Sequence, residues 1–161
     1  MTKAHFTYRA DDEAATERLG YVLAEMLDEG TVVALDGPLG SGKTRLVQAI
    51  AAASGVDRRD VVSPTFVLMH EYQGRRAVIH LDAYRLRDAD EFLQLGVEEA
   101  FAGPNLVFIE WAGRVANCLP SERIEITISV LPDDARQFDV VATGAQYAPL
   151  VEQLQRRLSA T

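Results

Sequence analysis

The feature that most constrains this chain is the segment GPLGSGKT at residues 37–44, which follows the apolar run TVVAL. It fits the P-loop pattern G-x-x-x-x-G-K-[ST]. The fixed positions of that pattern fall on Gly37, Gly42, Lys43 and Thr44. Glycines let the backbone curl until its N–H groups point at phosphate oxygens, and the helix that follows adds the partial positive charge of its N-terminus. The lysine can reach the β- and γ-phosphates, and the threonine offers its hydroxyl to Mg²⁺. The segment therefore predicts a nucleoside triphosphate site.

Length and composition predict one globular domain. The 161 residues are enough for one hydrophobic core and few for two, so we expect a single domain over residues 1–161. No apolar run approaches the roughly 18 residues of a membrane helix. The first twenty residues carry charges and lack the apolar core of a secretory signal. A lone cysteine, Cys118, cannot form an internal disulfide and fits a reducing compartment. We therefore expect a cytoplasmic protein that does not enter a membrane.

The net charge of −8 and the pI of about 4.8 argue against independent binding of RNA or DNA, because neutralising phosphates requires a basic surface. Arginines do occur in local pairs, and we interpret them as solvated surface. These pairs are Arg58 and Arg59, Arg75 and Arg76, Arg85 and Arg87, and Arg156 and Arg157.

The order of predicted elements gives the fold class. Strands are expected at 5–9, 31–35, 65–73, 75–84, 105–111, 122–131 and 136–144. Helices are expected at 11–30, 44–55, 88–96, 97–102 and 146–159, with Gly30 and Gly55 ending the first two. We expect two antiparallel hairpins, one formed by residues 65–73 and 75–84 and the other by residues 122–131 and 136–144. We therefore predict an α/β P-loop NTPase fold, with a mixed parallel and antiparallel sheet flanked by helices.

Two carboxylates are candidates to complete the site. The apolar strands AVIHLD and LVFIE end in Asp82 and Glu110, which parallel strands would deliver to the carboxyl edge of the sheet. Such acids hold the metal or orient the attacking water in P-loop enzymes. Either could instead cap the turn after its strand. Thr65, in the segment SPTF, could sense a γ-phosphate through Mg²⁺ or could mark a plain junction between loop and strand.

The side chains around these acids allow two interpretations each. His80 lies two residues before Asp82 on the same face of its strand, and is either a packed, hydrogen-bonded histidine or a catalytic one. Tyr84 and Arg85 follow the strand, where a positive group could reach a phosphate or a partner. Trp111 either buries its indole or lines the nucleotide pocket.

Taken together, the motifs resemble the bacterial TsaE family, the small ATPases of tRNA threonylcarbamoyladenosine biosynthesis. The resemblance runs from about residue 10 to residue 131, in order and with matching spacing. It is carried by GPLGSGKT, SPTF (63–66), HLDAYRL (80–86), LGVEEAF (95–101) and FIEWAGR (108–114). The P-loop is common to many families, whereas the H-x-D-x-Y-R and I-E-W elements together are far more specific.

The resemblance implies a protein that binds ATP and Mg²⁺, hydrolyses ATP slowly when alone, and works with a TsaD–TsaB pair that transfers threonylcarbamoyl to a tRNA adenosine. It also implies that the protein acts on tRNA indirectly, through the TsaD–TsaB pair. The implied metal ligands are Thr44, Glu110 and Asp82, and the implied catalytic residues are Lys43, Asp82, Glu110 and Thr65. The implied nucleotide-binding residues are Gly37, Leu39, Gly40, Ser41, Gly42, Lys43, Thr44, Arg45, Trp111, Arg136 and Glu13, with the last two near the base or ribose.

Three other functions fit the P-loop. A small-molecule kinase would need an arginine-bearing lid and an acceptor pocket, for which residues 86–104 are short, although they include Arg87. A GTPase would normally carry an N-K-x-D loop, and none follows Asp82. An adaptor could use ATP only to hold a binding surface. The partner-dependent ATPase is the function that the sequence favours.

Overall fold

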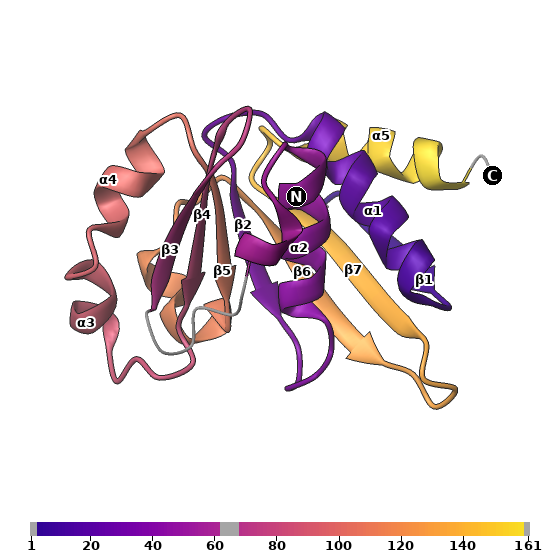
Figure 1. The fold of residues 1–161 in the computed structure, drawn as a ribbon, viewed down its shortest axis with the longest axis horizontal. Coiled ribbons are helices and arrows are strands. Elements are labelled where there is room, and N and C mark those ends of the chain that lie inside the picture. Colours follow the sequence, from indigo (N-terminus) through magenta and orange to yellow (C-terminus); the bar gives the residue numbers. More distant parts are fainter. Residues whose placement is uncertain (1–2, 62–67, 160–161) are drawn as a thin grey trace.

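The computed structural model describes residues 3–61 and 68–159, which form a seven-stranded sheet with helices on both faces (Figure 1). The strands are β1 (His5–Ala10), β2 (Val32–Asp36), β3 (Met69–Gln73), β4 (Ala77–Asp82), β5 (Leu106–Glu110), β6 (Arg123–Val130) and β7 (Arg136–Thr143). The helices are α1 (Glu13–Met26), α2 (Lys43–Ala53), α3 (Ala89–Leu93), α4 (Val97–Ala102) and α5 (Ala148–Ser159). Two 3₁₀ segments are η1 (Arg58–Asp60) and η2 (Ala112–Cys118).

The strand order is β1-β7-β6-β2-β5-β4-β3. The four central strands β6, β2, β5 and β4 are parallel, and antiparallel pairs with β7 and β3 extend the sheet on either side. The predicted α/β fold with a mixed sheet is confirmed. Because parallel strands end at one edge, this order brings three acids to it: Asp36 from β2, Asp82 from β4 and Glu110 from β5.

Each face of the sheet has its own core. Side chains alternate along a strand, so Leu35 and Phe108 point to the face covered by α1, α2 and α5. Ala34, Ile79 and Ile109 point to the opposite face, which packs with α3, α4 and η2. Figure 1 shows α1 and α2 lying across one face of the sheet. No helix within residues 3–61 and 68–159 is both long enough and apolar enough to span a membrane.

The first helix is shorter than its sequence pattern predicted. α1 ends at Met26, and Leu27 turns to an extended conformation and is buried. Gly30, expected as the helix C-cap, instead adopts φ +92° in the turn before β2, where its N–H donates to the Asn105 carbonyl at 2.9 Å. The burial of Leu27 and this turn outweigh the helical periodicity of the segment. The end of α2 agrees better, since Ser54 caps it and Gly55 follows at φ +93°.

The interpretation of every arginine pair as solvated surface is wrong for Arg76, which is partly buried in the turn between β3 and β4, whereas Arg75 of the same turn is exposed. Arg76 donates to the Leu27 and Ala24 carbonyls at the end of α1, and Arg75 donates to the Ala53 carbonyl at the end of α2. Neither helix has a basic residue in its own last turn. The turn therefore supplies the positive charge and donors that the two helix C-termini require.

Candidate functional site

The P-loop turns from β2 into α2 as its sequence pattern predicts. Gly42 is the N-cap of α2 at φ +110°, a left-handed conformation that a glycine adopts without a steric penalty. The N–H of Ser41 donates to the Pro38 carbonyl at 3.0 Å, which closes the loop. As a glycine, Gly42 has no side chain that could accept from the first N–H groups of the helix. The first backbone N–H groups of α2 therefore keep their capacity to donate to an anion.

Lys43 is buried and bound to its own loop. Its Nζ donates to the carbonyls of Gly37 at 2.7 Å and Pro38 at 3.1 Å, and it lies 4.1 Å from the centroid of the Trp111 ring. Burial lowers the pKa of Lys43, and the negative charges of neighbouring acids, Glu110 first among them, oppose that shift. The ammonium group is thus held at the loop by neutral carbonyls and an indole face, which an anionic ligand can replace.

Glu110 lies at the centre of a chain of polar contacts beneath α2. The Thr44 hydroxyl donates to Glu110 Oε2 at 2.8 Å and lies 3.1 Å from Oε1. The ring nitrogen Nε2 of His80 lies 2.5 Å from Oε2 of the same carboxylate. Both His80 and Glu110 are buried. The sequence identified these residues separately, and the structure joins them in one cluster.

Asp82 is buried beside Glu110, which it faces across the β4–β5 register. Its Oδ1 accepts a hydrogen bond from the N–H of Tyr84 at 2.8 Å, so Asp82 also caps the turn that follows β4. The two interpretations of this acid are therefore compatible. One side of the carboxylate stabilises the turn while the residue lines the cavity at the P-loop.

A cavity of about 340 Å³ lies above these groups. Its lining residues are Leu39, Gly40, Gly42, Lys43, Thr44, Arg45, Asp82, Tyr84, Glu110 and Trp111. Among the described residues, no three His, Cys, Asp or Glu side chains converge as a complete metal site. A threonine hydroxyl with one or two carboxylates is instead the donor set that suits Mg²⁺ held jointly with phosphate oxygens. The residues present therefore fit Mg²⁺ bound together with a nucleotide.

A second cavity of about 330 Å³ adjoins the P-loop on the side of α1 and the β6–β7 turn. Glu13 lies 3.1 Å from the guanidinium of Arg45 across its rim. Arg136, at the start of β7, donates from Nε to the Ser41 carbonyl at 3.1 Å. The structure thus brings Glu13, Arg45 and Arg136 together beside the P-loop, although they come from three distant parts of the chain.

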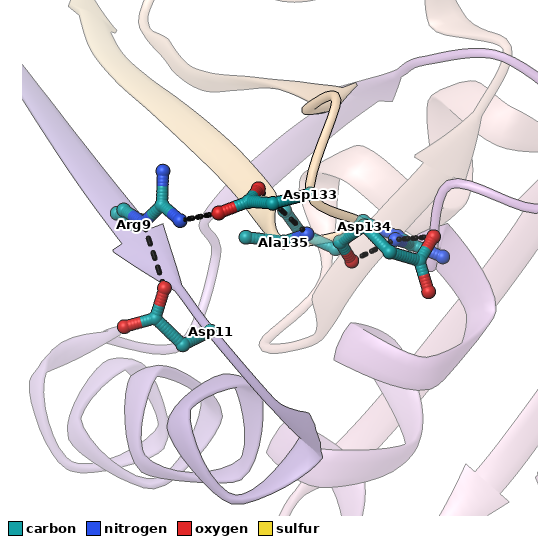
Figure 2. A network of polar contacts seen from close by, with 6 residues as sticks. Arg9, Asp11, Asp133, Asp134 and Ala135 are labelled. Atoms are coloured by element: carbon teal, nitrogen blue, oxygen red, sulfur yellow. Dashed lines mark hydrogen bonds and ion pairs between the residues drawn. The ribbon is translucent and has the colours of Figure 1, made fainter.

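The outer wall of this second cavity is braced by ion pairs. Figure 2 shows Arg9, at the end of β1, pointing to Asp11 on one side and to Asp133 on the other. Asp133 also accepts from the N–H of Ala135 at 3.3 Å, and the neighbouring Asp134 pairs with Arg136 at 3.1 Å. The β6–β7 turn is therefore tied both to the entry of α1 and, through Arg136, to the P-loop.

Aromatic residues line the mouth of the first cavity. Trp111 adopts φ +60° and packs against Tyr84, with ring centroids 4.9 Å apart. The guanidinium carbon of Arg114 lies 6.0 Å from the Tyr84 ring centroid. Tyr84 and Arg85 are exposed, and Leu39 at the tip of the P-loop is 84% exposed. Thr65 lies outside the described residues.

Sequence reasoning missed Asp36, the last residue of β2. Both of its carboxylate oxygens accept from the N–H of Gly113, at 3.1 and 3.0 Å, which ties the segment after Trp111 to the base of the P-loop. Burial raises the pKa of Asp36. The signal was available, because TVVALD is an apolar strand ending in an acid, the same pattern that identified Asp82 and Glu110.

Comparison with known proteins identifies relatives along nearly the whole chain. Residues 10–138 match the family described as "Threonylcarbamoyl adenosine biosynthesis protein TsaE". The chain is 39% identical over 125 residues to the tRNA threonylcarbamoyladenosine biosynthesis protein TsaE of Treponema pallidum, an alignment that covers 78% of this chain and 92% of that protein. It is 35% identical over 150 residues to the protein of the same name from Bacillus subtilis, with 92% and 93% covered.

A solved structure shares the fold. The crystal structure of Bacillus subtilis YdiB superposes with a TM-score of 0.85 at 30% sequence identity, and the alignment covers 98% of both chains. The similarity therefore includes the outer strands and helices as well as the P-loop.

Proposed function

The chain belongs to the TsaE family of tRNA threonylcarbamoyladenosine biosynthesis proteins, and from this membership we propose that it is a Mg²⁺-dependent ATPase that supports threonylcarbamoyl transfer to tRNA adenosine by a TsaD–TsaB partner complex. The observation that carries the ATPase proposal is the cluster of Lys43, Thr44 and Glu110 at one cavity. Residues 1–161 act in this proposal as a single ATPase domain.

The P-loop binds the triphosphate. When ATP enters, the Lys43 ammonium leaves the carbonyls of Gly37 and Pro38 for the phosphate oxygens, an exchange of neutral acceptors for charged ones that strengthens each hydrogen bond. The N–H groups at the start of α2 donate to the same phosphates. Glu13, Arg45 and Arg136 then hold the nucleoside side of ATP in the adjoining cavity.

Three side chains hold Mg²⁺ with the nucleotide: the Thr44 hydroxyl and the carboxylates of Glu110 and Asp82. Bound there, Mg²⁺ would neutralise charge that develops on the phosphate oxygens. A carboxylate oxygen of Asp82 or Glu110 that does not contact the metal orients the attacking water, and burial of both acids keeps that water in a fixed electrostatic environment. In this proposal Thr65 contacts the γ-phosphate.

The partner complex docks near the mouth of the site. Leu39 and Tyr84 are large side chains exposed at the rim of the cavity, which supports a contact made next to the nucleotide. The acidic charge of the chain, −8 overall, favours a protein partner over direct contact with tRNA. Contact beside the site would let docking and hydrolysis influence each other.

The test is phosphate release from ATP and Mg²⁺ by the purified protein, alone and with the cognate TsaD–TsaB pair and tRNA. We expect slow release alone, faster release with the partners, and no release by Lys43→Ala, which should not bind the nucleotide. Asp82→Ala and Glu110→Ala should retain much of the binding but lose hydrolysis by a factor of about 10² to 10³, as for other preorganised electrostatic groups.

Three results would redirect the assignment. Wild-type rates in Asp82→Ala and Glu110→Ala would remove those residues from catalysis. Transfer of the γ-phosphoryl group to a small acceptor without free phosphate would identify a kinase, and preference for GTP over ATP would identify a GTPase. Full tRNA modification with a Glu110→Ala protein that cannot hydrolyse ATP would support the adaptor function, in which ATP only holds a binding surface.

A further inference from the structure

His80 is the one fully buried histidine among the described residues, and its position is fixed by the sheet. It lies in β4 directly opposite Phe108 of β5, two residues before the point where Asp82 faces Glu110. Its ring packs against Tyr72 of β3, with centroids 6.2 Å apart and the planes at 50°. A polar ring in an apolar layer is costly unless it is hydrogen-bonded. The contact with Glu110 satisfies Nε2, whereas Nδ1 is buried and has no hydrogen-bond partner among the described residues.

The polarity of that bond follows from the chemistry of the acceptor. A carboxylate that binds a cation only accepts hydrogen bonds, so in the proposed metal site the hydrogen of the 2.5 Å contact between His80 Nε2 and Glu110 Oε2 belongs to the imidazole. The Thr44 hydroxyl donates to the same Oε2 at 2.8 Å. Among the described residues, the hydrogen-bond partner of the other oxygen, Oε1, is the Thr44 hydroxyl at the longer distance of 3.1 Å. Two donors thus hold Oε2, and Oε1 keeps most of its capacity to bind a cation.

We propose that His80 is a positioning residue, whose Nε2–H group holds Oε2 of Glu110 so that Oε1 is presented to the divalent cation of the bound nucleotide. The proposal rests on the Mg²⁺–nucleotide site of the proposed function, and it assigns His80 no contact with the substrate. Hydrogen bonds to metal-binding carboxylates typically contribute a factor of 10 to 100 to metal affinity. We therefore expect His80 to act on metal affinity with little effect on the binding of metal-free nucleotide.

Two substitutions separate the hydrogen bond from the packing of the ring. In His80→Gln the side-chain amide nitrogen can take the place of Nε2 and restore the donor to Glu110. In His80→Asn the shorter side chain carries its amide nitrogen at the place of Nδ1, out of reach of Oε2. The matched control is His70→Asn. His70 lies directly opposite His80 in the β3–β4 register and stacks on Tyr72 at 5.9 Å, and Glu110 is not among its hydrogen-bond partners.

The readout is Mn²⁺ binding to the complex of the full-length protein with ADP, measured by electron paramagnetic resonance, beside ADP binding in EDTA. We expect His80→Asn to weaken Mn²⁺ binding about 10- to 100-fold. His80→Gln and His70→Asn should remain near wild type, and all four proteins should bind metal-free ADP alike. Wild-type Mn²⁺ affinity in His80→Asn would overturn the proposal. Equal losses in the folded Gln and Asn variants would also overturn it, because the donor would then be irrelevant.

Thermal melting in EDTA identifies a variant that does not fold. If His80→Asn fails that check, His80→Gln decides alone, since retained Mn²⁺ affinity supports the proposal and its loss in a folded protein overturns it. The outcome is separate from the ATPase assignment. The expected Mn²⁺ differences in a protein that releases no phosphate would support the role of His80 and reject hydrolysis. Normal ATP hydrolysis by the wild type, together with unchanged Mn²⁺ affinity in His80→Asn, would support the ATPase assignment and reject the role of His80.

Discussion

Because Lys43 contacts Trp111, the fluorescence of this tryptophan should depend on whether a nucleotide is bound at the P-loop. The Lys43 ammonium lies 4.1 Å from the indole centroid, and Trp111 is the single tryptophan of the sequence. A triphosphate should draw the ammonium away from the ring. We therefore expect the emission of Trp111 to change when ATP binds, and a fluorescence titration measures both the change and the affinity.

The control for that titration is Lys43→Met, which keeps an unbranched apolar chain near the indole and removes the charge. Losing charged hydrogen bonds to phosphate, each worth about 1.5–3 kcal/mol, should abolish the response at ATP concentrations that saturate the wild type. An unchanged titration curve in Lys43→Met would show that Lys43 does not meet the phosphates.

Asp36 predicts a pH dependence of stability. Burial raises the pKa of its carboxyl, so the folded protein keeps a proton that the unfolded chain, with a pKa of about 3.9, has already lost. The stability that this proton provides is complete below the unfolded pKa and is lost as the pH rises through the folded pKa. Asp36→Asn keeps an oxygen for the N–H of Gly113 and has no charge to bury. The variant should therefore gain stability over the wild type as the pH rises through that window.

Urea unfolding of both proteins over a pH series measures the difference, and other carboxylates cancel because both proteins share them. The two curves should converge at the acid end and run parallel, with the variant above, once Asp36 is ionised in both states. A constant difference across the series, or one that shrinks as pH rises, would contradict the raised pKa.

At the scale of single residues, the sequence predicted which side chains are candidates for the site better than it predicted which of them contact one another. Asp82 and Glu110 were found because an apolar strand ending in an acid can be read directly. The contact between His80 and Glu110 joins residues thirty positions apart and depends on the β4–β5 register, which no local pattern fixes. The αL turn at Trp111 was equally hidden, since Asp36 and Gly113 meet only after the strands have assembled.

Among the elements, the turn between β3 and β4 contacts the C-terminal ends of α1 and α2, the two helices that lie side by side on one face of the sheet. Arg76 donates to two carbonyls at the end of α1, and Gly74 lies so close to α2 that an added Cβ would approach the Ser54 carbonyl to 2.4 Å. Arg76→Met keeps the stem and removes the donors. We expect it to lower the unfolding free energy by about 1–3 kcal/mol, measured by urea denaturation.

The comparison variant for the turn is Arg59→Met. Arg59 pairs with Asp57 at 2.8 Å, but its side chain is 90% exposed, so the substitution should leave stability almost unchanged. Equal effects of Arg76→Met and Arg59→Met would mean that the capping contacts add nothing. The same contacts explain why the end of α1 was mispredicted, because its carbonyls are satisfied from a distant turn and need no glycine cap.

On the scale of the whole molecule, the site unites segments from nearly the full length of the chain. Residues 10–13 at the start of α1, the P-loop and residues 134–138 line one cavity, and the ends of β4 and β5 line the other. In Figure 1 the chain's first and last strands, β1 and β7, run side by side. The fold class could be predicted because each element has a local pattern. The cavity beside α1 has no such local pattern, because it depends on β7 lying between β1 and β6, and only the family resemblance suggested that Glu13 and Arg136 lie near each other.

This assembly predicts that nucleotide stabilises the entire fold. Because segments so far apart form the two cavities, the unfolded chain has no equivalent site, and ligand binds the folded state alone. At 100 times its dissociation constant, MgADP should then add about 2.7 kcal/mol to the unfolding free energy. For a chain of this length that corresponds to a rise of about 5–11 °C in the melting temperature, which differential scanning fluorimetry measures. Lys43→Met should show no rise, and Arg59→Met should show the full one. A rise confined to part of the unfolding transition would mean that the P-loop region melts independently, and that the strands at the two ends of the chain are not coupled to the nucleotide.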